Sequence, residues 1–317
     1  MQTQFLQIIN RMIPIILLIM IGKLFQVKNF VQEKSIIDIK KLVVNFTLPA
    51  VLFLSFLKAD FQLGFLWLVP VIVGFCILLF FVGVVLRNSL PVSDRYLPFL
   101  MTGFEYGMLG VSLFGAAYGL EQIEKIAIVD LGQETFIWFI YVALLLREVD
   151  GKAQPGKLVK MFATSPVILA ILAGLILNFL GLGEILTQLP ITGGILVTVE
   201  WTAGITIPLI LIVVGYGLRF DINQMVYAGR VIIVRLAICV PTALLLNRYL
   251  IRGLMSLGKG FEAALFTLLI LPPPFILTLF MKQDQKDAIH RVDSTLTLHT
   301  VVTIIVFLVY YALNPVI

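Results

Sequence analysis

The chain has little of what soluble enzymes and metalloproteins use. Only 13% of its 317 residues are charged, against about 25% in ordinary soluble domains. It has two cysteines and two histidines; Cys76 and Cys239 lie within apolar runs, where cysteine behaves as a small apolar residue, and His290 and His299 are too isolated to form a metal cluster. No G-x-x-x-x-G-K-[ST] segment is present. The sequence therefore predicts no metal, no cofactor, no disulfide and no ATP-driven motor.

Apolar residues are abundant instead. They make up 60% of the chain, and the mean hydropathy is +1.05. This composition is typical of a polytopic membrane protein. The net charge of +5 needs no nucleic-acid partner, because the inner loops of membrane proteins are rich in Lys and Arg.

Runs of about 20 apolar residues indicate helices that span the bilayer. No segment between the runs is long enough to hold a soluble domain, so we expect a single all-α transmembrane domain over residues 1–317. The ten expected spans cover roughly 5–25, 37–57, 63–86, 97–119, 123–146, 163–181, 191–218, 229–250, 260–281 and 295–316.

The distribution of Lys and Arg predicts the orientation. With the amino terminus outside, sixteen of the 23 lie in expected inner loops, including Arg147–Lys160, and six lie on the outer side. The remaining one, Arg235, lies within a span. Because positive charge favours the cytoplasmic side, we expect a cell-membrane protein with both termini outside.

The two halves of the chain share short motifs in the same order. Pro14-x-Ile-Leu-x-Ile-x-x-Gly22 in the first expected span recurs at Pro166–Gly174 in the sixth, 152 residues later. Thr47-Leu-Pro49 in the second recurs as Thr206-Ile-Pro208 in the seventh, 159 residues later. A repeat of five spans is odd in number, so the second copy enters the membrane upside down. We expect inverted repeats over about 1–148 and 160–317, with the substrate site where they meet.

The fourth and ninth spans carry signs of a broken helix. Leu271 is followed by three prolines, which remove backbone donors and clash with the preceding turn. The partner segment Thr102–Gly110 contains Glu105 and Tyr106, followed by Gly107 and Gly110, which loosen a helix. Interrupted helices in matching positions of two repeats indicate a transport site.

Several polar residues within the spans are candidates for binding or coupling. Glu105 lies about 12 Å into its span at helical rise, where a carboxylate is costly and usually functional, unless the span begins later. Asp130 and Glu134 are four residues apart on one helix face and either share a cation or proton, or face a watery vestibule. Arg235 either snorkels to the inner surface or neutralises a carboxylate, and Asn45 bonds either a ligand or a loosened carbonyl.

Taken together, the motifs resemble those of the auxin efflux carrier family, whose bacterial members include malate and malonate permeases. The resemblance rests on Asn45–Pro49, on Gly107 and Gly110, on Pro166 with Gly174, on Thr206–Leu209 leading to Gly215, and on Leu271–Pro273. It covers nearly the whole chain. It implies ten spans, crossed broken helices at the fourth and ninth positions, and gradient-driven movement of organic anions.

The chain departs from the family pattern at three places. Glu105 stands where the family usually has asparagine, and Ser112 stands where it has proline. Pro274 and Phe275 follow the paired prolines, where the family prefers small residues. If Glu105 is protonated it can donate a hydrogen bond to a substrate carboxylate as an asparagine amide would, which predicts proton-linked transport.

The leading interpretation is a secondary carrier of small organic anions such as malate, with no enzymatic activity. A carrier of a neutral or cationic solute remains open because of Glu105, and so does a membrane sensor or scaffold with a transporter fold. An intramembrane enzyme is disfavoured because the usual paired catalytic motifs are absent.

The expected partners are a small-molecule substrate, the lipid bilayer and, as an open alternative, a second copy of the chain. The candidate substrate-binding residues are Glu105, Tyr106, Gly107, Gly110, Pro272, Pro273, Asn45, Pro49 and Pro208, and the candidate coupling residues are Glu105, Asp130, Glu134 and Arg235.

Overall fold

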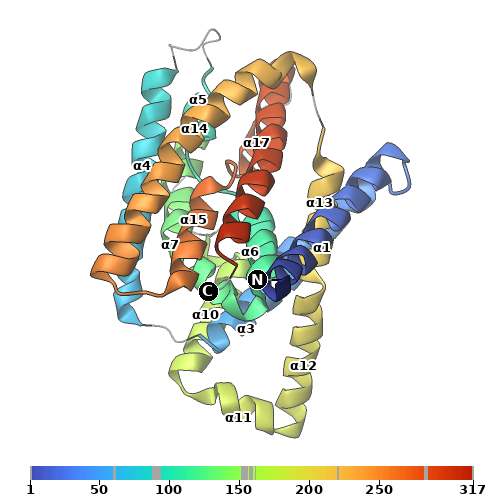
Figure 1. Ribbon diagram of the computed structural model, residues 1–317, viewed down its shortest axis with the longest axis vertical. Helices are drawn as coiled ribbons and strands as arrows, with labels where there is room; N and C mark the ends of the chain where they lie inside the picture. Colours follow the sequence, from blue (N-terminus) through green and yellow to red (C-terminus); the bar gives the residue numbers. More distant parts are fainter. Residues whose placement is uncertain are drawn as a thin grey trace.

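The computed structural model of the chain describes residues 2–59, 62–87, 94–150, 156, 160, 162–219, 221–281 and 285–315. The regular elements of this described part are all helices (Figure 1). Eight helical segments in it are long and apolar enough to cross a membrane, which confirms a polytopic membrane protein. They are Ile9–Val27, Glu33–Leu57, Leu63–Leu86, Leu97–Tyr118, Leu120–Val149, Pro190–Gly217, Ile222–Leu254 and Lys286–Leu313.

The other two expected spans are shorter. The sixth is α10, Pro166–Phe179, whose 14 residues rise only about 21 Å at the usual 1.5 Å per residue. The ninth is divided by the prolines into α15, Lys259–Ile270, and α16, Ile276–Phe280. The count of ten spans therefore stays a prediction. Most of the expected inner loop Arg147–Lys160 lies outside the described residues, although α8, Val142–Asp150, covers its beginning.

Proline interrupts the second and seventh spans at matching places. In the second, α2 (Glu33–Leu42) is joined to α3 (Leu48–Leu57) by a π-helical turn over Val43–Thr47. Pro49 has no N–H to continue the ladder of the preceding turn, so the backbone widens there. In the seventh, α12 (Pro190–Gly204) ends just before α13 (Thr206–Gly217), which contains Pro208.

These spans form a first helix group, made of α1 (Gln2–Val27), α2–α3, α10 and α12–α13. In it α1 packs along α13, as the right side of Figure 1 shows, and α10 packs along α3. Both contacts bring backbones together at a glycine. A Cβ on Gly22 of α1 would lie 2.0 Å from the Ile212 carbonyl oxygen, and one on Gly174 of α10 would lie 2.6 Å from the Phe53 carbonyl oxygen.

A second helix group packs against the broken helices, which also contact the first group. It contains α4 (Leu68–Leu86), α7 (Ile123–Phe136), α14 (Met225–Leu246) and α17 (Lys286–Leu313). Here α4 packs on α7 and α14 packs on α17. In Figure 1 α4 stands at the left, and α14 and α17 lie between it and α13.

The two broken helices run through the middle of the molecule. The first consists of α5 (Leu97–Met101), a non-helical segment, a π-helical turn over Tyr106–Gly110 and α6 (Val111–Tyr118). It is buried almost throughout. The second is α15 with α16, and α15 packs on α7 and α14. An irregular backbone is tolerated at membrane depth only where protein or water covers it, as it is here.

Candidate functional site

The structure brings the two helix breaks into direct contact. The Glu105 N–H donates to the Pro272 carbonyl oxygen over 2.8 Å. In return, the Phe275 N–H donates to Oε2 of the Glu105 carboxylate over 2.7 Å. Gly103, at the start of the first break, has a left-handed backbone with φ of 69° and lies against the Pro274 ring. We call this region, Thr102–Gly110 with Leu271–Phe275, the crossing.

Glu105 holds the crossing together as a hydrogen-bond acceptor. Its half-buried carboxylate also accepts from the Met108 N–H at 3.4 Å and so caps the helical turn that follows. Within the described part of the chain, no Lys or Arg forms an ion pair with it. The Glu105 carboxylate therefore links the two broken helices by accepting a backbone N–H from each.

Arg235 of α14 binds the breaks from the other side. Its fully buried guanidinium donates to the carbonyl oxygens of Leu100 at 3.1 Å, of Leu271 at 3.2 Å, and of Gly103. It also lies 4.9 Å from the centre of the Phe104 ring. Carbonyls freed by a helix break have no water to bond at this depth, and the fork of an arginine supplies several donors at once. In this structure Arg235 thus neither reaches the surface nor pairs with Glu105.

Gln133, which the sequence did not single out, connects the crossing to Asp130. Its amide oxygen accepts from the Phe104 N–H at 2.8 Å, and its amide nitrogen donates to Oδ1 of Asp130 at 3.0 Å. Glu134 has a separate partner, the indole N–H of Trp138 at 2.8 Å. Gln133 lies three residues after Asp130, and this helical spacing was the signal available in the sequence.

The remaining candidates fall into two sets. Tyr106 is buried in the crossing, and its hydroxyl has no hydrogen-bond partner among the described residues. Gly110 lies against Leu271, and Pro272 and Pro273 are buried beside it. Gly107, also in the crossing, faces Leu48 of the first helix group. The other set belongs to that group: Pro49 is half-buried, and Pro208 and Asn45 are exposed. Asn45 donates to the Lys41 carbonyl at 2.8 Å, in the last turn of α2 just before the widened turn.

Two cavities lie between the helix groups. The first, of about 370 Å³, reaches the crossing at Met108 and Phe275; the second, of about 420 Å³, lies around Ser55 and Lys58. Both touch the span Glu33–Leu57, one at its beginning and one at its end. Lys40 and Lys58 are 18 residues apart, which is about 27 Å at helical rise. The walls of the first cavity come from α2, α13, α17 and the crossing, and those of the second from α3, α12 and the segment 120–124.

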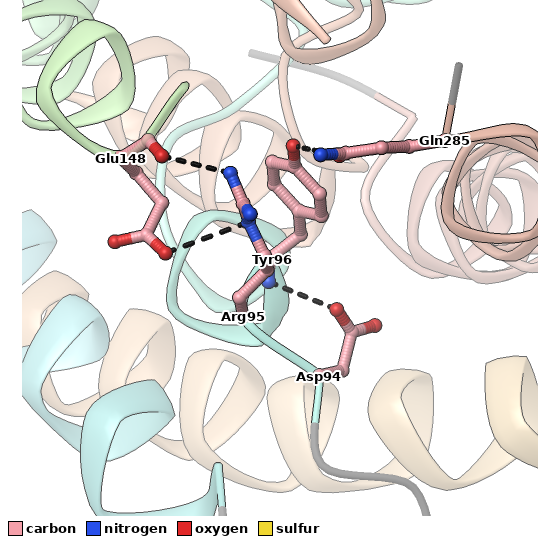
Figure 2. Close-up of polar contacts among 5 residues, drawn as sticks. All are labelled: Asp94, Arg95, Tyr96, Glu148 and Gln285. Carbon is pink, nitrogen blue, oxygen red and sulfur yellow. Dashed lines mark hydrogen bonds and ion pairs between the residues drawn. The ribbon is translucent and has the colours of Figure 1, made fainter. Parts of the chain in front are cut away.

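A polar network anchors the entrance to the first broken helix (Figure 2). Arg95 donates to the Glu148 carbonyl at 2.7 Å and lies 3.5 Å from its carboxylate, while the Tyr96 hydroxyl donates to Gln285 at 2.6 Å. The buried Asp94 accepts from the Tyr96 N–H at 2.9 Å. Burial raises the pKa of Tyr96, so its hydroxyl remains a donor at neutral pH. The network fixes α5 to its neighbours at one end.

No family model matches the chain. It is 25% identical over 216 residues to a protein of Methanothermobacter thermautotrophicus named "Uncharacterized transporter". The matched residues make up 66% of this chain and 67% of that protein. At this identity the similarity does not establish the resemblance to auxin efflux carriers, which stays a prediction.

Proposed function

We propose that the chain is a secondary transporter of small organic anions, and that the crossing forms the floor of its substrate site. The observation that carries the proposal is the contact between two helix breaks at membrane depth, with a cavity that ends on them. Helices interrupted near the bilayer midplane are the usual construction of substrate sites in secondary transporters. The name of the archaeal relative agrees with this class of function.

We infer that the chain is built from two inverted repeats of five spans each. The motif offset of 159 residues relates Phe53 to Ile212 and Leu57 to Tyr216. Gly22 faces Ile212 and Tyr216, and Gly174 faces Phe53 and Leu57. Exchanging the two halves turns the contact of Gly22 into the contact of Gly174. This symmetry supports two inverted copies.

The placement of the cavities supports alternating access. They lie at opposite ends of one span, and the crossing is beside the end of the first. In the expected orientation the first cavity opens inward, because Glu33 and Arg219 at its wall belong to predicted inner loops. Movement of the second helix group against the first would open the other cavity to the crossing.

Single cysteines at Asn29 and Ser256, both exposed, should react with an impermeant thiol reagent from the inner and the outer side respectively.

Flux measurements test the function directly. The purified chain is reconstituted into lipid vesicles, and uptake of radiolabelled monocarboxylates and dicarboxylates is followed with and without a pH gradient. We expect saturable uptake of at least one acid, faster with the gradient. Specific binding without any flux would instead indicate a sensor, and flux of amines or sugars alone would exclude the anion class.

A further inference from the structure

One face of α2 forms a wall of the first cavity. Glu33, Ile36, Ile37 and Lys40 all line it, and their spacing of three and four residues places them on a single helix face. Lys40 is the last of these four residues in the chain, and its side chain is half-buried. Its ammonium nitrogen lies 5.7 Å from the centre of the Phe275 ring.

The charge of Lys40 is not neutralised by an ion pair. In the described ranges no carboxylate lies within 4.0 Å of its ammonium. The other basic residue of the cavity, Arg219, is paired with Glu33 at 3.1 Å, and both are largely exposed. The cavity therefore presents one cation that forms no ion pair with the described residues, close to the crossing and within electrostatic reach of the Glu105 carboxylate.

The surroundings of Lys40 suit an acid with an apolar body. Val213, Val214 and Leu296 contribute apolar surface, and the Phe275 ring lies beside the ammonium. A half-buried ammonium attracts a carboxylate more strongly than one in open water, because the local dielectric is lower. Phe275 also donates its N–H to Glu105, so a carboxylate at Lys40 would lie next to the crossing.

A second carboxylate on the ligand would meet repulsion. The exposed Asp293 lines the cavity, and Glu105 lies behind its wall, where its carboxylate accepts the N–H of the lining residue Phe275. Like charges held at close range in a partly buried site cost binding energy. We propose that Lys40 is the anion-binding group of this cavity and selects organic acids with one carboxylate over dicarboxylates. This inference rests on the proposed transport function for its role in the cell, but the binding itself is separable from transport.

Two variants and one matched control isolate the charge of Lys40. Lys40→Gln removes the charge, and Lys40→Arg keeps it. Lys41→Gln is the control, because the neighbouring Lys41 is on an exposed face and pairs with Asp38 at 3.5 Å. The ligands are radiolabelled 2-oxoisovalerate, a branched monocarboxylate that stays ionised at neutral pH, and malate. Binding is measured as thermal stabilisation in detergent, and flux is measured in vesicles.

We expect Lys40→Gln to weaken 2-oxoisovalerate binding about tenfold or more, as loss of a charge-assisted hydrogen bond does, and to raise the KM of its flux in parallel. Lys40→Arg and Lys41→Gln should stay within about twofold of the wild type, with malate bound more weakly than 2-oxoisovalerate by all three. Equal affinity of Lys40→Gln and Lys41→Gln would overturn the assignment of Lys40, and a preference for malate would overturn the selection of one carboxylate. Lys40-dependent binding without flux would uphold the site and refute the transport function, and absence of both binding and flux would refute both.

Discussion

The two halves of the molecule agree in their scaffold and differ in their breaks. In the proposed repeat, Gly22 and Gly174 occupy equivalent contacts in the first helix group, each against the backbone of the opposite half. At the crossing, by contrast, the first break contributes the carboxylate of Glu105, and the second has three prolines without N–H groups. The comparison indicates that the scaffold repeats one kind of contact, whereas the crossing joins two unlike segments. Both segments leave carbonyls that Arg235 bonds, but only the first supplies a carboxylate.

The largest effect should follow from removing Arg235, which bonds carbonyls of both breaks. Arg235→Met leaves three buried carbonyl oxygens without this donor, and each unsatisfied group costs about 1–3 kcal/mol. We expect a loss of several kcal/mol and little folded protein by size-exclusion chromatography and thermal unfolding. Arg230→Met, on the exposed face of the same helix, is the control. Equal stability of the two variants would show that the carbonyls find other donors.

A side chain at either scaffold glycine should destabilise the protein to a similar degree. In Gly22→Val and Gly174→Val the new Cβ would lie within 2.6 Å of a backbone carbonyl oxygen, and overpacking of this kind costs about 1–3 kcal/mol. Gly74→Val on α4 is the control, since nothing lies within 4 Å of its Cβ position. Thermal unfolding in detergent measures the difference. If only one of the two glycines is sensitive, the contacts are not equivalent.

Restoring backbone donors to the second break should abolish transport without preventing insertion. In Pro272→Ala with Pro273→Ala, the helix can extend beyond α15 as far as Pro274, which would withdraw the carbonyl of residue 272 from the Glu105 N–H. Membrane yield and vesicle flux are measured together. Pro241→Ala, within α14, controls for loss of a proline elsewhere. Normal flux in the double variant would show that the break is only a kink in the helix and is not needed for transport.

The smallest effect on stability, but a specific one on pH dependence, is expected for Glu105→Gln. A protonated Glu105 does not repel an anion, so anion flux in the wild type should fall as the pH rises and the carboxylate ionises. Glutamine keeps the shape and does not titrate, so its flux should change little with pH, while its single amide oxygen can accept from only one of the two N–H groups that Glu105 bonds. Asp38→Asn, at an exposed residue that pairs with Lys41 and lines neither cavity, is the control. A pH profile of Glu105→Gln that follows the wild type would assign the proton linkage to another group, with Asp130 the next to test.

The sequence was sufficient for eight of the ten expected spans and for the positions of the two breaks at the crossing, because proline, glycine and apolar run length act locally. The residues that hold the breaks were harder to predict. Arg235 bonds backbone carbonyls, and the sequence does not show which carbonyls are left free. Gln133 and Lys40 lie against residues more than 25 positions away in the chain, Phe104 and Phe275 respectively. The length of α10 could not be predicted either, since the apolar run continues beyond the point where its helix ends.

The shortness of α10 has a mechanical consequence for the surrounding lipid. Its exposed side chains Leu169, Leu172, Ile176 and Phe179 form one apolar stripe, yet the helix is about 21 Å long beside a hydrocarbon layer of about 30 Å. A bilayer thins locally around a short apolar segment, at an energy cost that increases with the mismatch. The acyl-chain length of the membrane should therefore bear on α10, which packs along α3, and through it on the helix group that faces both cavities.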